Sequence, residues 1–232
     1  MKLTTMRRRA AASAVLLALA GVSGCAGGGG PDVSAEGQVA YACALAARAA
    51  AGLQSPDDWE APEMIGESAE PAAVELAAAG SLAGGIAAFD IPGHGGISAA
   101  GKDLVGGVSQ MNAGALEDAL GRMNAACDQE VPERPPEEHT SAEGRVVYAC
   151  ALAEFVREER GDAGTWGGIG EEPALHEAGS VGALLGGLNG HVMPEAPAVS
   201  TEGAAVVRSV TVLDADGVDA SLDAVISACQ AR

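Results

Sequence analysis

The sequence predicts an all-α protein built from two tandem copies of a small four-helix domain, each copy with one disulfide between its first and its last helix. Three observations predict this fold class: a long internal repeat, apolar residues at helical spacing in both copies, and a pair of cysteines at matching places in each. A chain that repeats one unit folds that unit twice, so each feature of the first copy is expected again in the second.

The repeat is clearest where each copy begins. SAEGQVAYACALA starts at Ser34 and SAEGRVVYACALA starts at Ser141, an offset of 107 with eleven of thirteen positions identical. A five-residue deletion then reduces the offset to 102 for the rest of the copy. The copies therefore run over 34–130 and 141–232. Between them, 131–140 is rich in proline and charge, which favours an extended, semi-rigid spacer and some freedom between two domains.

The first and last helices of each copy have clear signals. Ser34 and Ser141 are suitable N-caps, and an acid follows each in the first turn, where the helix dipole favours negative charge. The last segments share an apolar spacing of four, three and four that ends on cysteine. These positions are Leu116, Leu120, Met123 and Cys127, and Val218, Leu222, Val225 and Cys229. The two cysteines are expected to face the core from amphipathic helices.

Two middle helices complete each copy. Pro71 and Pro173 suit the first turn of a second helix, where the missing N–H of proline costs nothing. The third segment, 104–111 in one copy and 206–213 in the other, is ambiguous. In the second copy it has the composition of a strand, yet both copies share apolar spacings of one, three and three, which are helical. We expect a helix, with a strand as the alternative.

The N-terminus has the features of an export signal. A basic region containing Lys2 and three arginines precedes the apolar run AAASAVLLALAGV, which is too short to span a membrane as a mature helix. The run ends in Val22-Ser23-Gly24-Cys25. This tetrapeptide resembles the lipobox of bacterial lipoproteins, in which small residues precede a cysteine that is lipidated before cleavage.

The resemblance implies that the signal peptide 1–24 is removed and that Cys25 carries a diacylglyceryl group and acyl chains such as palmitate. Two or three chains hold a protein stably on a bilayer, at about 0.8 kcal/mol per buried methylene. Residues 25–33 then form the lipidated cysteine and a flexible glycine-rich tether. We expect the chain on the extracytoplasmic face of the cell membrane, through either general or twin-arginine export.

Four cysteines remain for an oxidising compartment, in which disulfides form. Four cysteines allow three pairings. Each copy has one cysteine in its first helix and one in its last, so a single arrangement serves both copies alike. It joins Cys43 to Cys127 and Cys150 to Cys229. The alternative, a zinc site, needs ligands at short spacing, and none of the four has another cysteine or a histidine within a few residues.

Charge and motifs exclude several classes of function. Residues 1–24 hold four of the 13 basic residues and none of the 32 acidic ones, so the mature chain has 9 against 32 and a net charge of −23. Such a surface argues against nucleic-acid partners. Familiar hydrolase, nucleotide and metalloprotease motifs are absent. The acidic segment 214–223 lacks calcium-loop spacing, so Asp214 is interpreted as a helix N-cap. No catalytic, cofactor or metal residue is predicted.

Four of the six aromatic residues recur between the copies: Tyr41, Trp59, Tyr148 and Trp166. We interpret them as core anchors, and the alternative is a ligand groove flanked by a tryptophan loop, with one site per copy. The sequence thus predicts a non-enzymatic binding or interaction module for an envelope or extracellular protein or a small ligand. The alternative is a cell-envelope hydrolase with a pair of carboxylates in a cleft.

Overall fold

A computed structural model describes residues 30–52, 71–89, 91, 93–110, 112–131, 133–167, 173–188 and 197–232. Within these residues the regular secondary structure is entirely helical, so the predicted all-α class is confirmed. No helix of this described part is long and apolar enough to cross a membrane. The signal peptide, Cys25 and Trp59 lie outside the described residues.

Each copy contributes four α-helices in the same order. In the first copy they are α1 (Ala35–Gly52), α2 (Pro71–Phe89), α3 (Gly95–Gln110) and α4 (Ala113–Glu130). In the second copy they are α5 (Ala142–Phe155), α6 (Pro173–Gly186), α7 (Pro197–Thr211) and α8 (Ala215–Gln230). The described residues also include the short helical segments η2 (Glu137–Thr140), η3 (Val156–Arg160) and η4 (Ala163–Thr165).

The helices begin where the sequence predicts. The Oγ of Ser34 accepts a hydrogen bond from the backbone N of Gly37 at 3.2 Å, and the Oγ of Ser141 accepts one from Gly144 at 3.1 Å. Asp214 caps α8 in the same way. Helices α2 and α6 begin on their prolines. Of the ambiguous third segments, 104–110 lies in α3 and 206–211 lies in α7, whereas 212–213 forms a turn. The helical periodicity therefore outweighed the strand-like composition.

Both predicted disulfides are present. Cys43–Cys127 joins α1 to α4, and Cys150–Cys229 joins α5 to α8. The bonded cysteines are 84 and 79 residues apart in the sequence. Each bridge contributes about 4 kcal/mol in the chain-entropy model. Among the described residues, no three side chains of the metal-binding types lie together in a way that could hold an ion.

Glycine allows a close helix crossing in each copy. A Cβ added to Gly101 of α3 would lie 2.4 Å from the Cβ of Ala83 in α2. In the second copy, a Cβ added to Gly203 of α7 would lie 2.4 Å from the Cβ of Leu185 in α6. Real Cβ atoms do not approach so closely, so each pair of helices can lie this near only because the position is glycine.

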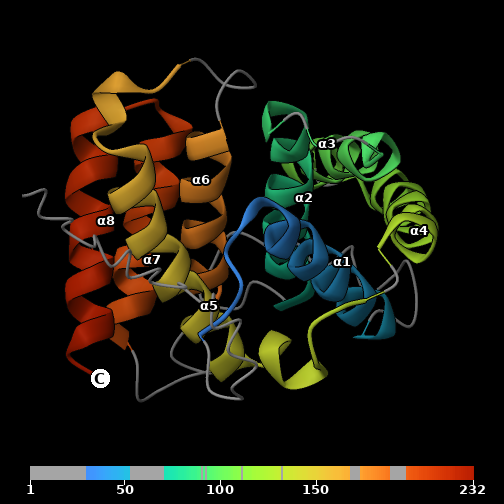
Figure 1. Cartoon of the computed structure of the whole chain (residues 1–232), viewed down its shortest axis with the longest axis horizontal. Helices are drawn as coiled ribbons and strands as arrows, with labels where there is room; N and C mark the ends of the chain where they lie inside the picture. Colours follow the sequence, from blue (N-terminus) through green and yellow to red (C-terminus); the bar gives the residue numbers. More distant parts are fainter. Residues whose placement is uncertain are drawn as a thin grey trace, which may run out of the picture.

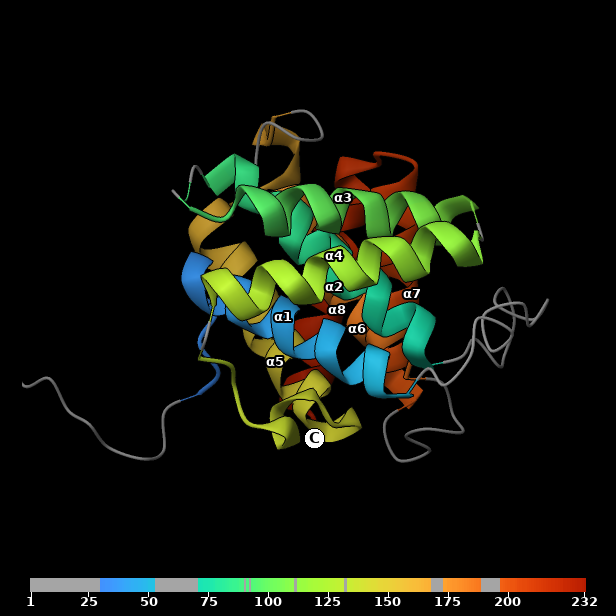
Figure 2. The same cartoon turned by 90° about the vertical axis from the view of Figure 1, so that its right-hand side faces the viewer.

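The two copies pack together as one body. Helices α2 and α6 face each other along the middle, with α3 and α4 on one outer side and α7 and α8 on the other (Figures 1 and 2). Buried apolar residues of both copies form one continuous core. The expected freedom between the copies is therefore wrong. The segment 131–140 is also not an extended spacer throughout, because it ends in η2, which contacts both α1 and α5.

The physical reason lies in α2 rather than in the spacer. Its sequence, PAAVELAAAGSLAGGIAAF, is apolar on all sides, which is typical of a helix that is buried all round. A single four-helix copy could cover only part of that surface. Helix α6 of the other copy packs along α2, and the short connection between the copies permits this contact.

Candidate functional site at the junction of the two copies

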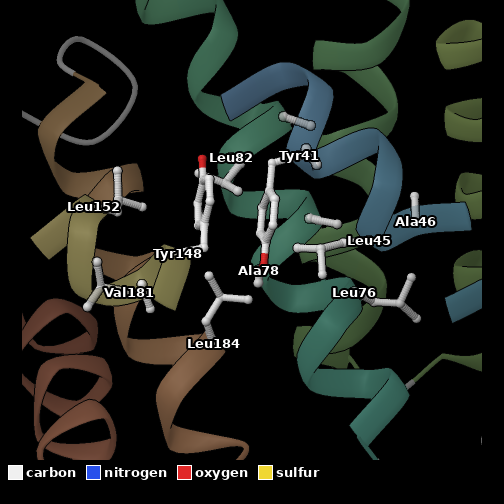
Figure 3. Close-up of a cluster of buried hydrophobic side chains, with 14 of the residues drawn as sticks. Tyr41, Leu45, Ala46, Leu76, Ala78, Leu82, Tyr148, Leu152, Val181 and Leu184 are labelled. Carbon is white, nitrogen blue, oxygen red and sulfur yellow. The ribbon is translucent and has the colours of Figure 1, made fainter. Parts of the chain in front are cut away.

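The centre of the junction is a stacked pair of tyrosines. Tyr41 of α1 and Tyr148 of α5 occupy matching positions of the repeat, and each is 2% exposed. Their rings are parallel within 2°, and the ring centroids are 3.5 Å apart. Figure 3 shows the two hydroxyl groups pointing in opposite directions. Two equivalent residues that stack in antiparallel orientation indicate an approximate two-fold axis through the stack.

Polar contacts cross the junction in matching pairs. The Nε2 of Gln38 donates a hydrogen bond to Oε1 of Glu177 at 2.8 Å. At the related place, Nη1 of Arg145 lies 3.0 Å from Oε1 of Glu75. Gln38 and Arg145 share one position of the repeat, and Glu75 and Glu177 share another. Such reciprocity is the property of an isologous interface, here formed within one chain.

Each buried carboxylate also pairs with an arginine of its own copy. Arg48 lies 3.3 Å from Glu75, and Arg160 donates two hydrogen bonds of 3.0 Å to Glu177. Burial raises the pKa of Glu75 above its ordinary value, while the charges of Arg145 and Arg48 lower it. An unpaired buried charge costs several kcal/mol. Arg145, the nearer of the two cations beside Glu75, comes from the other copy. Separating the copies would therefore remove one of the charges that compensate Glu75.

A pocket of about 330 Å³ opens beside the tyrosine stack. Both copies and the segments that lead into them contribute its walls, which are mainly apolar. The residues that define it include Pro31, Ala40, Tyr41, Pro135, His139 and Tyr148. We call it the junction pocket. Its walls come from both copies, so it exists only while the copies are packed together.

The hydroxyls of the two tyrosines that line this pocket differ in their partners. The hydroxyl of Tyr41 donates to the carbonyl oxygen of His139 at 3.1 Å. The hydroxyl of Tyr148 is buried and has no hydrogen-bond partner in the described structure. Burial raises the pKa of Tyr148, and the negative charge of Asp32 adds to that effect, so the phenol stays protonated. A buried polar group without a partner costs about 1–3 kcal/mol, which a ligand could recover.

In the second copy, Tyr148 and Trp166 do not line a common pocket among those described, and the groove expected in the first copy depends on Trp59 and stays a prediction. The structure joins Tyr41 and Tyr148 in a single pocket. Trp166 lies elsewhere, packed against the core, with its Nε1 donating to the carbonyl of Arg160 at 3.1 Å. Trp59, its counterpart, is outside the described residues. A signal for the junction was present in the sequence: one glutamate, Glu75 or Glu177, at the same position of the mainly apolar second helix of each copy.

No known protein family, curated protein or solved structure matches this chain. Its function is therefore inferred from its own residues.

Proposed function

We propose that this chain is an extracytoplasmic lipoprotein, held on the membrane by lipid on Cys25, and that its two copies form one non-enzymatic binding module. The junction pocket is the binding site. Its ligand is small and largely apolar, with one group that forms a hydrogen bond to Tyr148. The observation that carries this proposal is the pocket wall, to which both stacked tyrosines contribute, together with the hydroxyl of Tyr148, which is buried without a partner.

The chemistry of the pocket supports such a ligand. A volume of about 330 Å³ lies near the lower end of small-molecule sites, which span roughly 300–1,000 Å³. Tyrosine rings and prolines offer rigid apolar contact. A phenol can donate to a carbonyl or ether oxygen and can accept from an N–H group. The ligand is therefore expected to be compact and uncharged.

An acid-pair hydrolase has less support among the described residues. Glu75, whose pKa is raised, is 4% exposed and lies between two arginines. Neither Glu75 nor Glu177 lines the junction pocket. Both carboxylates hold the copies together, and the binding function is the better account of the site.

The anchor would place the pocket near the lipid. Pro31 lies on the pocket wall, six residues after Cys25. Six residues of extended chain reach at most about 20 Å. Mass spectrometry of the membrane-extracted protein tests the anchor and should find a diacylglyceryl group on Cys25 at a new N-terminus. A Cys25→Ser variant should carry no diacylglyceryl group and keep its signal peptide, and an unmodified Cys25 in the native protein would overturn the anchor.

The fluorophore N-phenyl-1-naphthylamine, which is uncharged and brightens in apolar sites, tests the pocket. We expect saturable binding to the full-length exported protein. Ala40→Trp should abolish binding because the indole fills the pocket. Tyr148→Phe should weaken it about fivefold, since loss of one hydrogen bond costs about 1 kcal/mol. Fluorescence titration measures both effects.

Val147 supplies the matched control. It occupies the position of Ala40 in the second copy, is 48% exposed and does not line the junction pocket. Val147→Trp should therefore leave the binding of N-phenyl-1-naphthylamine unchanged. Binding that survives Ala40→Trp, or that both variants lose equally, would contradict the assignment of the pocket.

A further inference from the structure

The two disulfides occupy matching places in the repeat but differ in exposure. Cys43 and Cys127 are fully buried, each 0% exposed. Cys150 and Cys229 are both partly exposed. A thiol in solution attacks a disulfide sulfur directly, so access decides which bridge can react in the folded protein.

The exposed bridge lies in a groove on the second copy. This groove has a volume of about 910 Å³, and its walls are helix α5, the first turn of α7, the C-terminal end of the chain from α8 onward, and Pro31 of the N-terminal segment. Both Cys150 and Cys229 line it. Val147, 48% exposed, stands on the α5 side. Arg232 and Glu143, also lining residues, form an ion pair of 2.9 Å. We call this space the second-copy groove.

The sequence explains why the first copy is more closed at the corresponding place. There α3 begins with two glycines, and a Cβ on Gly96 would lie 2.8 Å from Oε1 of Glu130 and 3.3 Å from the Cβ of Ala126. Helix α3 can therefore lie directly on the end of α4. In the second copy the matching residues are Pro197 and Ala198, which carry side chains where the first copy has glycine, and both line the groove.

We propose that Cys150–Cys229 is a site of thiol–disulfide exchange, at which a dithiol that enters the second-copy groove reduces the bridge. Cys43–Cys127 is instead a permanent structural bridge. One thiol of the dithiol loses its proton to solvent, and its thiolate attacks one Sγ atom. The Cys150–Cys229 bond breaks, a mixed disulfide forms, and the other cysteine leaves as a thiolate that takes up a proton.

The second thiol of the reagent completes the reaction. It loses its proton and displaces the protein sulfur, which also takes up a proton, while the reagent closes its own disulfide. Two electrons pass from the dithiol to the protein, which ends with two cysteine thiols. Glu143 and Glu154 line the groove of an already acidic chain, so the dithiol should carry no negative charge besides the attacking thiolate.

Graded reduction of the folded, oxidised full-length protein by dithiothreitol tests the proposal. Samples are quenched with N-ethylmaleimide, and peptide mass spectrometry measures labelling at each cysteine. We expect Cys150 and Cys229 to be labelled at least tenfold faster than Cys43 and Cys127, at a rate proportional to the dithiothreitol concentration. Equal rates for the two bridges, or faster labelling of Cys43 and Cys127, would overturn the proposal.

A groove variant separates access from local unfolding. Val147→Trp places an indole beside the bridge and should slow the labelling of Cys150 and Cys229 severalfold without changing the melting temperature of the oxidised protein. Ala40→Trp, the matched change in the first copy, should leave that rate unchanged. A Val147→Trp variant that reacts as fast as the wild type would show that the thiol does not enter through the groove, and the proposal would fail.

Discussion

Arg145 shows at the scale of one residue how the copies are held in register. It is 2% exposed and belongs to the second copy, yet its ion-pair partner, Glu75, belongs to the first. The same position of the first copy holds Gln38, a neutral residue that contacts Glu177. The duplicated interface is therefore alike in geometry but not in charge. Gln38 of the first copy pairs with Glu177 of the second, and Arg145 of the second copy pairs with Glu75 of the first.

Arg145→Gln, which introduces the residue of the first copy, should lower the free energy of unfolding by about 3 kcal/mol, because Glu75 then keeps only Arg48. Adding Glu75→Gln should recover part of that loss. Urea unfolding of the single and double variants measures both values.

Arg122 is the control for this pair. It forms an ion pair of 2.8 Å with Asp103, and both side chains are more than half exposed. Arg122→Gln should change stability by less than about 1 kcal/mol. If Arg145→Gln cost no more than Arg122→Gln, the buried pair would not stabilise the junction.

His176 gives the junction a dependence on pH. It packs against α2, where a Cβ on Gly85 would lie 3.0 Å from its own Cβ. Burial, and then the charge of Lys102, lower the pKa of His176 below its ordinary value of 6.5, while Glu177 opposes them. The folded state therefore binds the proton less readily than the unfolded state. Stability is fully present above about pH 6.5 and falls as the pH drops towards the lowered pKa.

His176→Val carries the residue that the first copy has at this position, Val74. Between pH 7 and pH 5 the wild type should lose more stability than this variant. Thermal unfolding at several pH values, followed by circular dichroism, measures the difference. Parallel curves for the two proteins would mean that His176 is not the titrating group.

At the scale of the elements, the sequence predicted the helix caps and the disulfide pairing. Ser34 and Ser141 cap the helices that they precede, and each disulfide joins the first and last helix of its own copy. Such features follow from spacing within one helix or from comparison of the two copies. The close crossings at Gly101 and Gly203 could not be predicted, because the sequence does not show which residue of the neighbouring helix lies against a glycine.

Gly101→Ala should lower stability by about 1–3 kcal/mol, because its methyl group would overlap Ala83. Gly106 lies in the same helix, α3, with nothing within 4 Å of the site of a Cβ. Gly106→Ala should instead raise stability by about 0.5–1 kcal/mol, since alanine is the better helix former. Urea unfolding compares them, and effects of the same sign would refute the close crossing.

At the scale of the whole molecule, the sequence indicated two domains with a spacer, and the structure joins them. The proline-rich segment 131–140 has the composition of a spacer, but composition describes only the connection. The decisive contacts join α2 to α6 and Tyr41 to Tyr148, which are far apart in the sequence. Repetition revealed that these residues are equivalent. It could not reveal that equivalent residues meet each other across a two-fold axis.

The central claim is that the two copies form one unit, because the proposed binding pocket exists only at their junction. Differential scanning calorimetry of the oxidised full-length protein tests it most directly. One cooperative unit gives a ratio of calorimetric to van't Hoff enthalpy of about 1, and two independent copies give about 2. We predict a single transition with the lower ratio. Two transitions, or a ratio near the higher value, would show that the copies unfold separately and would contradict the shared junction.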